Sequence, residues 1–502
     1  MLVVVSNREP YIHERAEGGL IVAHSTTGGV SVALDALMRE EGGTWIAHGA
    51  GSADRDVVDQ YDRVAVPPDH PAYLLRRIWL TEDEERRYYG GFANEGLWPL
   101  CHLTNVNPVF RADDWAAYQT VNRRFAEAIR SELTDPLQPV FIQDYHLALA
   151  AGHLRELVPA ARTAIFWHIP WPQLDRLTRC PWWRALVEGL LSNDFVAFQV
   201  ERDRRNFIAA ARACGATTAD RGIVAHRGRV VRVAAVTIGV DFDRISAIAR
   251  EPALAGEMDR LRSELRLAGT IVGVGVDRLD YTKGIPERLA ALERVLESDP
   301  DLRERLTFVQ VGVPSRSKLG SYAAIERRID AKVAAINERF GRNANDGPVR
   351  YRKSALKLRR LVALFKLADF CIVSSLHDGM NLVAKEFAAA RDDERGVLVL
   401  SELTGAAQEL KDALLINPYE VERFAAAIRR AIEMPRAEQA SRMRALRRAV
   451  AGRDVFAWAS DILGHLEDLD SAAIGYDRRV AVRGVHTSRG ALPDRAAERR
   501  KS

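Results

Sequence analysis

This sequence of 502 residues has few of the features that mark secreted, membrane-spanning or metal-binding proteins. The four cysteines lie far apart and form no CxxC pair, which excludes a disulfide framework and a zinc ribbon. No run reaches the roughly 18 apolar residues that a membrane span needs, and the N-terminal apolar run is too short for a signal peptide. We expect a soluble, cytoplasmic protein without a membrane partner.

An excess of charge of one sign is also missing. The 72 basic side chains stand against 68 acidic ones, which gives a net charge of +4. Residues 471–502 hold eight basic and three acidic side chains, so the remaining chain carries −1. A nearly neutral body argues against a nucleic-acid partner. The basic tail has little apolar periodicity and is predicted to be disordered.

Short apolar runs alternate with longer segments of helical period, such as residues 30–41, 114–132 and 285–297. The short runs are apolar on both faces, as are strands of a parallel sheet that helices cover. Strand–helix alternation predicts an α/β fold of doubly wound, Rossmann-like domains. The predicted strands are residues 2–6, 139–143, 163–168, 194–199, 270–276, 306–311, 370–374, 396–401 and 413–416.

The predicted strands fall into two groups, which suggests two domains facing a cleft. We place one domain at residues 1–240 and the other at 241–453, with a helix over 251–267 between the strand groups. Residues 454–470 carry apolar side chains at helical spacing and are predicted to pack on the body as a final helix. Residues 471–502 form the basic tail.

Glycine fingerprints for nucleotides are absent. There is no GxxxxGK[ST] motif, and Gly273, Gly275 and Arg278 give only GxGxxR inside a predicted strand. A nicotinamide oxidoreductase is therefore disfavoured. In open α/β sheets ligands bind beyond the carboxyl ends of the strands, so the polar residues that directly follow apolar runs are the candidates.

Two cations follow the strand at 270–276. Arg278 and Lys283 stand at the strand end and in the next turn, which Gly284 closes. Together they suit a diphosphate, with Arg as a fork and Lys as a point charge. Arg316, after the strand at 306–311, is a third candidate cation.

A carboxylate-rich turn follows the strand at 370–374. Asp378 lies in the turn, Gly379 permits it to be tight, and Asn381 can start a helix that carries Glu386. Carboxylates accept from hydroxyls and backbone N–H groups bind phosphate. With Arg278 and Lys283, this turn predicts a sugar-nucleotide site.

The first half offers polar residues at three predicted strand ends. Arg8 follows the first strand, Asp144 the strand at 139–143, and His168 the strand at 163–168. A structural and a functional role both stay open for His168. The pair Gly28–Gly29 opens a helix, whose N-terminus can bind an anion. Gly18–Gly19 is predicted to be a plain turn.

Five segments together resemble the family of trehalose-6-phosphate synthases, retaining GT-B glycosyltransferases that include glucosylglycerol-phosphate synthase. The resemblance runs from about residue 2 to residue 469. The segments are Val5–Arg8, Asp144–Leu147, His168–Pro170, Arg278–Gly284 and Asp378–Glu386.

The resemblance implies residue roles. The first domain would carry the acceptor site, the second the nucleotide-sugar site, and residues 454–470 the closing segment. The catalytic residues would be Arg278, Lys283, His168 and Asp378. The donor would be bound by these four together with Gly28, Gly29, Gly379, Met380, Asn381, Leu382, Val383 and Glu386. The acceptor sugar phosphate would be bound by Arg8, Tyr89, Trp98, Asp144 and Arg316.

The implied reaction moves glucose from UDP-glucose, or another nucleotide glucose, to glucose 6-phosphate. Front-side displacement is the expected mechanism, assisted by the departing diphosphate and needing no metal or other cofactor. A covalent nucleophile, Asp378 or Asp144, is the competing mechanism. A separate phosphatase is expected to make free trehalose, and a homo-oligomer is possible.

Four departures from the family pattern keep alternatives open. His377 replaces a usual Arg, the loop between Arg8 and Gly28 is long, and His48 stands where a Trp near the acceptor is usual. The uracil slot around residues 352–356 is not a standard match, so the nucleotide base stays open. Glycerol 3-phosphate as acceptor, or a pseudo-enzyme that keeps the fold, are the alternatives.

We predict that deletion of residues 471–502 leaves the transferase activity of the chain intact, because the charges assigned to substrates lie outside this tail. Steady-state rates of the full and shortened chains check this. A large loss of activity would give the tail a role in the chemistry.

Overall fold

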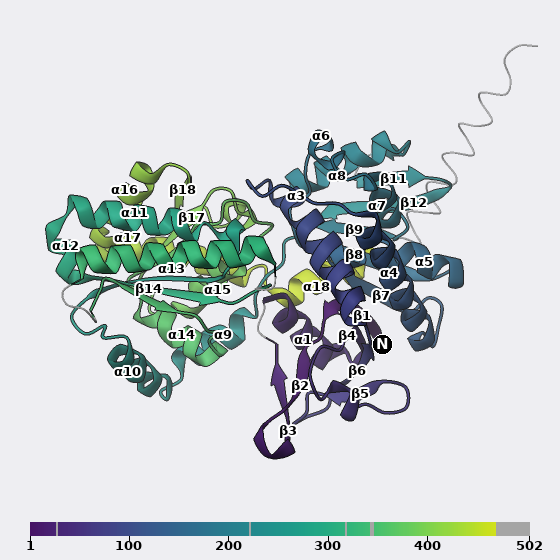
Figure 1. The fold of residues 1–502 in the computed structure, drawn as a ribbon, viewed down its shortest axis with the longest axis horizontal. Helices are drawn as coiled ribbons and strands as arrows, with labels where there is room; N and C mark the ends of the chain where they lie inside the picture. The colour runs from purple at the N-terminus through teal and green to yellow at the C-terminus, as the bar shows by residue number, and fades with distance from the viewer. Residues whose placement is uncertain (27–28, 220–221, 317–318, 342–345, 468–502) are drawn as a thin grey trace, which may run out of the picture.

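The computed structural model describes residues 1–26, 29–219, 222–316, 319–341 and 346–467. They form two α/β lobes that lie side by side, each built around its own sheet (Figure 1). This confirms the predicted fold of two Rossmann-like parallel-sheet domains. No helix in these ranges is long and apolar enough to cross a membrane.

The sheet of the first lobe has ten strands in the order β10-β11-β12-β9-β8-β7-β1-β4-β6-β5. Its middle seven strands, from β12 to β6, are parallel, whereas β5, β10 and β11 are antiparallel edges. The strands are β1 (Leu2–Arg8), β4 (Gly43–His48), β5 (Arg63–Val66), β6 (Tyr73–Ile78), β7 (Pro139–Gln143), β8 (Arg162–Trp167), β9 (Phe195–Phe198), β10 (Thr217–Ala219), β11 (Ile223–His226) and β12 (Arg229–Ala235).

The sheet of the second lobe has six parallel strands in the order β15-β14-β13-β16-β17-β18. Its central strands are buried on both faces, which agrees with their lack of polar alternation. The strands are β13 (Ile271–Arg278), β14 (Leu306–Val313), β15 (Val349–Arg352), β16 (Phe370–Val373), β17 (Val397–Ser401) and β18 (Leu414–Ile416).

Helices cover both faces of each sheet. In the first lobe these are α1 (Gly29–Glu41), α2 (Glu82–Glu85), α3 (Trp98–His102), α4 (Ala112–Glu132), α5 (Ala150–Leu157), α6 (Leu174–Leu177), α7 (Trp183–Leu190) and α8 (Glu201–Ala213). In the second lobe they are α9 (Phe242–Arg250), α10 (Leu254–Glu264), α11 (Ile285–Ser298), α12 (Pro300–Arg305), α13 (Gly320–Phe340), α14 (Leu358–Leu367), α15 (Leu382–Ala390), α16 (Val421–Glu433) and α17 (Arg436–Ala451).

All nine predicted strands form, with ends shifted by at most two residues. Others were not predicted, among them β4, β6 and the hairpin β2 (Tyr11–Arg15)–β3 (Ile21–Ser25). The predicted turn at Gly18–Gly19 joins this hairpin, and both glycines have φ near +80°. The predicted helix at 251–267 is shorter, because residues 251–253 separate α9 from α10 and Pro252 lacks an N–H for a continuous helix.

The chain crosses between the lobes twice, and the two crossings touch. Residues 236–241 lead from β12 to α9, and residues 452–454 lead from α17 to α18 (Val455–Glu467). The Val455 N–H donates to the Val240 carbonyl over 3.3 Å. A Cβ on Gly239 would lie 2.2 Å from the Arg453 carbonyl oxygen, so the crossings are in van der Waals contact.

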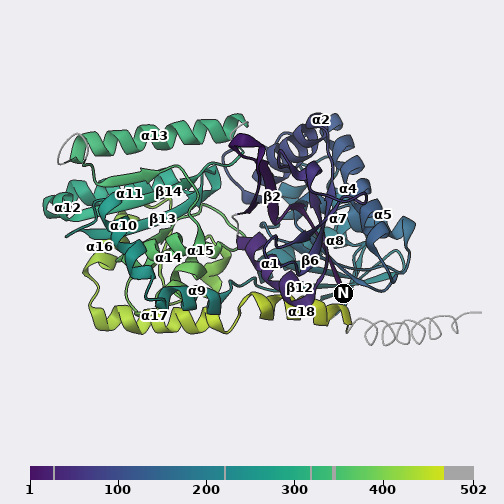
Figure 2. The same cartoon turned by 90° about the horizontal axis from the view of Figure 1, so that it is seen from below.

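Helix α18 returns to the first lobe, as Figure 2 shows along the lower edge of both lobes. Its buried Trp458 packs on Phe141 and Phe166, with ring centroids 5.5 and 5.1 Å apart. The predicted final helix is thus present up to residue 467. Residues 468–470 and the tail lie outside the described residues, and the domain boundaries at 240, 453 and 470 stay predictions.

A buried ion-pair network ties the β2–β3 hairpin to the first sheet. Arg77 on β6 is 1% exposed, and it pairs with Glu9 and Asp54 over 2.8 Å each. It also donates to the backbone carbonyl of Tyr11 at the start of the hairpin. Burial raises the pKa of Glu9 to about 8, against the lowering effect of Arg77. The cation therefore holds two carboxyl groups that are poorly solvated.

We predict that Arg77→Met lowers the free energy of unfolding by about 3–5 kcal/mol, because it leaves the buried acidic pair Glu9 and Asp54 without its cation. Urea denaturation followed by circular dichroism measures the change. Arg15→Met is the control, since Arg15 joins the same hairpin to Asp56 through a pair in which both side chains are over 40% exposed. An exposed pair contributes about 0–1 kcal/mol, so equal losses in the two variants would contradict the prediction.

Candidate active site

The predicted site residues gather where the carboxyl ends of the two sheets meet. Arg8 ends β1, Asp144 follows β7 and His168 follows β8 in the first lobe. Across from them, a Cβ on Gly379 would lie 2.1 Å from the His168 carbonyl oxygen. The backbones of the two lobes are therefore in direct contact at the centre of the site.

Lys283 and Asp378 form an ion pair at the base of this contact. Lys283 lies in a 3-10 turn after β13, and its Nζ is 2.5 Å from Asp378 Oδ2. Ser375 Oγ and Asn381 Nδ2 donate to the same carboxylate over 3.1 and 3.3 Å. Burial raises the pKa of Asp378, but Lys283, with smaller effects from His102 and the Ser375 hydroxyl, outweighs it and brings the pKa to about 2. Asp378 is thus an anion at neutral pH.

The N-terminus of α15 opens into the site. Asn381, with φ 77°, is its N-cap, yet its side chain bonds to Ser375 and Asp378 instead of capping the helix. The first N–H groups of a helix have no partner within the helix. Together with the helix dipole, the uncapped N–H groups of Leu382 and Val383 make a site for an anion such as a phosphate.

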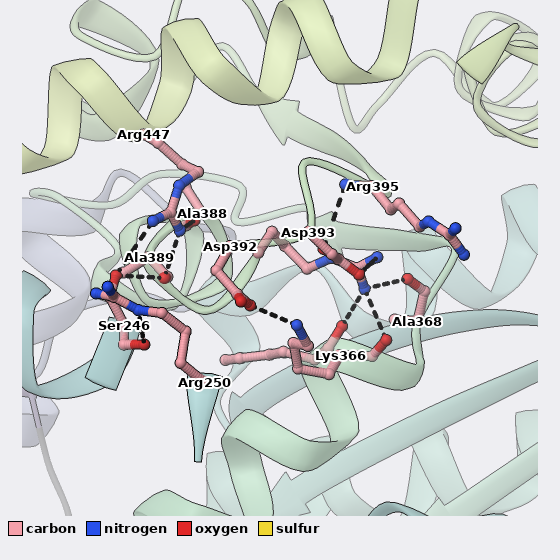
Figure 3. Close-up of polar contacts among 12 residues, drawn as sticks. Ser246, Arg250, Lys366, Ala368, Ala388, Ala389, Asp392, Asp393, Arg395 and Arg447 are labelled. Carbon is pink, nitrogen blue, oxygen red and sulfur yellow. Dashed lines mark hydrogen bonds and ion pairs between the residues drawn. The ribbon is translucent and has the colours of Figure 1, made fainter. Parts of the chain in front are cut away.

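The C-terminus of α15 is held by cations and hydroxyls of neighbouring helices (Figure 3). Arg447 of α17 donates to the carbonyls of Ala388 and Ala389 over 3.1 and 2.6 Å. Ser246 of α9 donates to the Ala389 carbonyl over 2.9 Å. A cation at a helix C-terminus stabilises the helix dipole, so α15 is fixed at the end away from the site.

Glu386 lies in the second turn of α15 and is half-buried. Burial raises the pKa of this carboxyl to about 7. It has no ion-pair partner among the residues that the structure describes. It is available to bind a hydroxyl group of a ligand.

Arg316 is surrounded by aromatic side chains. Its guanidinium donates to the hydroxyls of Tyr322 and Tyr145 over 2.6 and 3.1 Å and lies 4.2 Å from the Trp98 ring centroid. Asp280 lies 3.5 Å away. Arg316 is therefore positioned by two hydroxyls, an aromatic ring and one buried carboxylate, and its guanidinium lies beside Trp98 and Tyr89.

Arg278 and Arg8 add two cations around the same aromatic residues. Arg278 lies over Trp98, 5.2 Å from the ring centroid, and makes no ion pair with a described residue. Arg8 donates to the Tyr89 hydroxyl over 3.0 Å, and Arg316 Nε lies 3.5 Å from the same oxygen. Burial raises the pKa of Tyr89, but Arg316 and Arg8 bring it down to about 7.

Asp144 and His168 are linked through the backbone. Asp144 has φ 72°, a conformation that is strained for a non-glycine residue and typical of functional sites. Its Oδ1 accepts from the backbone N–H groups of Tyr145 and His168 over 2.9 and 3.1 Å. Burial raises the pKa of Asp144 to about 7, although these bonds, Arg316 and Arg278 lower it.

The ring of His168 is neutral and held on both sides. Burial lowers its pKa to about 3. Its Nε2 lies 2.9 Å from Gln143 Oε1, and its Nδ1 lies 3.4 Å from Gln199 Nε2. We assign the proton to Nε2, because it then donates to Gln143 while Nδ1 accepts from Gln199.

Nearly all of the predicted site residues converge on this cleft. Gly29 is the first residue of α1, and a Cβ there would lie 2.3 Å from Leu382 Cδ1, so the N-terminus of α1 approaches α15 closely. Gly28 lies outside the described residues. His48 ends β4 and is buried, and burial lowers its pKa. In the described ranges no group of three or more His, Cys, Asp or Glu side chains is placed to hold a metal ion.

Sequence reasoning missed several residues of the site. Tyr322, on α13, and Gln199, after β9, carried no motif that pointed to the cleft. Asp280 and Tyr145 lie inside the segments Arg278–Gly284 and Asp144–Leu147, but the sequence did not show that both side chains are buried. Tyr89 ends up in a buried π-helical segment, Arg86–Leu97, a form that is frequent at functional sites.

Comparisons with known proteins agree with this geometry. The family model for glycosyltransferase family 20 matches residues 1–468. The trehalose-6-phosphate synthase of Mycolicibacterium smegmatis is 38% identical over 473 residues, 92% of each chain. A crystal structure of the UDP-forming α,α-trehalose-phosphate synthase of Burkholderia xenovorans with glucose 6-phosphate has a TM-score of 0.83 and 31% identity, over 93% of this chain and 99% of that one. The enzyme of Burkholderia vietnamiensis has a TM-score of 0.83 and 33% identity, over 94% and 98%.

We predict that Asp144→Asn raises the melting temperature above pH 7 and that the gain disappears as the pH falls toward 4. The folded-state pKa of about 7 exceeds the ordinary 3.8, so the ionised carboxylate destabilises the fold and its effect grows as pH rises between these values. Thermal unfolding across pH 4–8 measures the difference between variant and parent.

Asp378→Asn is the control of opposite sign. Its folded-state pKa of about 2 means that the ionised form stabilises the fold above pH 4 and that this stabilisation is lost toward pH 2. Asp378→Asn should therefore lower the melting temperature throughout pH 5–8. A gain at position 144 that does not vary with pH would contradict the assignment.

Proposed function

The chain belongs to glycosyltransferase family 20, and on this basis we propose that it transfers glucose from UDP-glucose to glucose 6-phosphate. The products are UDP and α,α-trehalose 6-phosphate. One observation carries the proposal: Arg278 and Arg316 lie over the same ring, Trp98, while Lys283 stands on the Asp378 side of the site and Arg8 on the Tyr89 side. A reaction between two phosphorylated substrates needs such a pair of anion sites.

In the donor half, Arg278, Lys283 and the N-terminus of α15 bind the diphosphate. Asp378 is ionised and accepts from hydroxyls of the glucose, and Glu386 binds the ribose hydroxyls. The backbone from Gly379 to Val383 and the Gly28–Gly29 loop complete this half. Solved relatives are called UDP-forming, which supports uridine as the base.

In the acceptor half, Arg8 and Arg316 bind the phosphate of the sugar. Tyr89, which both cations contact, and Trp98 offer aromatic faces for a sugar ring, which favours a hexose over glycerol 3-phosphate as the acceptor. Asp144 binds a sugar hydroxyl. One solved relative contains glucose 6-phosphate, which supports this acceptor.

The chemistry proceeds by front-side displacement. The bond between the anomeric carbon and the diphosphate oxygen breaks while the acceptor hydroxyl forms a new bond on the same face, and its proton passes to the departing diphosphate. Arg278, Lys283 and the α15 N–H groups stabilise the charge that develops on this leaving group. A covalent intermediate is disfavoured, because Asp378 is ion-paired and Asp144 Oδ1 already accepts two N–H groups.

The wider setting belongs to the same proposal. A metal is not assigned a role, because the cations and helix N–H groups offset the diphosphate charge. We place the reaction in the cytoplasm, with a separate phosphatase as the consumer of the product. Homo-oligomers are compatible with the proposal but not needed for it.

We predict that Arg278→Ala lowers kcat at least about 10²-fold, as the removal of one charge-stabilising donor typically does. Purified protein is incubated with a panel of glucose nucleotides and phosphorylated acceptors, and the released nucleotide and the sugar product are identified. Arg184→Ala is the matched control, since Arg184 lies over Trp183 in a similar contact on α7, away from the cleft.

Each result of this assay decides a point. Transfer to glucose 6-phosphate with full activity of the control supports the proposal. Transfer only to glycerol 3-phosphate would contradict glucose 6-phosphate as the acceptor. If no pair of substrates releases a nucleotide, the proposed enzymatic activity is refuted. Unchanged kinetics of Arg278→Ala would show that the diphosphate site is misplaced.

A further inference from the structure

We infer that Gln199 and Lys385 are positioning residues that couple the crossing peptide at Ile238 to the two halves of the donor site. Lys385 lies outside the site described above, and Gln199 enters it only through its contact with the His168 ring. The inference rests on the proposed function only for its kinetic readout.

The first link joins the site to the crossing. Gln199 is 2% exposed, and its side-chain Nε2 faces Nδ1 of His168. The Oε1 of the same side chain accepts from the N–H of Ile238 over 3.1 Å. Thr237 also donates its hydroxyl to the backbone carbonyl of Gln199. One amide group thus orients the His168 ring and fixes the first residues of the crossing.

The second link joins the crossing to α15. The carbonyl of Ile238 accepts from Lys385 Nζ over 2.8 Å. Lys385 is fully buried, and its ammonium also pairs with Glu409 over 2.6 Å. Lys385 directly precedes Glu386, the residue assigned to the ribose. The N–H of the Ile238 residue is therefore bonded to one lobe and its carbonyl to the other.

The second crossing is tied to the same group. Glu409 lies 3.3 Å from Arg453, which belongs to the second crossing at residues 452–454. The C-terminus of α15 is held by Ser246, on the helix after the first crossing, and by Arg447, on the helix before the second (Figure 3). Helix α15 thus contacts the first crossing at its middle, through Lys385. At its C-terminus it contacts α9 and α17, the helices that flank the two crossings.

Close packing of the two lobes does not by itself require a buried lysine and a buried glutamine at the crossing. A fully buried ammonium is costly, and an apolar side chain of similar size often gives equal stability. The hydrogen bonds of Lys385 and Gln199 instead fix an orientation. Gln199 binds the N–H of Ile238 and Lys385 binds its carbonyl, so the relative position of the lobes and the orientation of His168 change together. Small displacements of reacting groups are known to cost large factors in rate.

The test is a double-mutant cycle with Gln199→Leu and Lys385→Met. We expect each single variant to raise the KM for UDP-glucose and lower its kcat/KM about tenfold, with the KM for glucose 6-phosphate little changed. We expect the double variant to lose about 10–20-fold instead of about 100-fold, because coupled residues are not additive. Additive losses, or equal changes in both KM values, would overturn the coupling.

Gln439→Leu is the matched control. Gln439 is also a buried glutamine that bonds to two backbone groups, at Gly396 and Met434, but it lies away from the crossings. It should lose similar stability without a change in the KM for UDP-glucose. A kinetic effect as large as that of Gln199→Leu would indicate a merely structural role.

Amide hydrogen exchange at Ile238 tests the coupling without substrate. Gln199→Leu removes the acceptor of this N–H and should speed its exchange. Lys385→Met should speed it too, since the release of the Ile238 carbonyl frees the same residue, whereas Gln439→Leu should not. Unchanged exchange in Lys385→Met would overturn the inference even if the parent enzyme transferred no glucose, so a failure here is distinct from a failure of the proposed function.

Discussion

The close approach of Gly379 to the backbone of His168 is the constraint on which the site depends. A Cβ at residue 379 would lie 2.1 Å from the His168 carbonyl oxygen, and a Cβ on Gly405 would lie 1.9 Å from the Gly379 carbonyl oxygen. The turn that carries Asp378 is therefore enclosed by backbone on both sides. Together with the hydrogen bond from Arg316 to the Tyr145 hydroxyl, this approach brings the strand ends of one lobe within reach of those of the other.

Given that approach, the cations of the cleft are held in two different ways. Lys283 pairs closely with Asp378 and keeps this carboxylate ionised. Arg316 faces a buried carboxylate, Asp280, only at the longer distance of 3.5 Å, and it is otherwise held by the hydroxyls of Tyr145 and Tyr322 and by the Trp98 ring. The difference follows from the partners, since hydroxyl groups satisfy N–H donors without cancelling their charge.

The parts that follow from parallel-sheet geometry could be predicted. Arg278 ends β13, Arg316 and Asp378 come shortly after β14 and β16, and the carboxyl ends of parallel strands meet at one edge. Strand β6 could not be predicted from apolar patterning, because Arg77 is buried only through Glu9 and Asp54, which come from distant segments. Gln199 gave no local signal for a similar reason: its partners are His168 and Ile238.

The length of α15 connects these observations. It has nine residues, so its N-terminus, its middle and its C-terminus are less than three turns apart. Because the helix is short, its C-terminus, held by Arg447 and Ser246, and its uncapped N-terminus belong to one rigid element. Under the coupling inferred above, a change in the crossing at Ile238 therefore reaches the N-terminus of α15 without bending a long element. Substrate binding at one end of α15 and the arrangement of the lobes at its middle are then two aspects of one equilibrium, since each must alter the other by the same free energy.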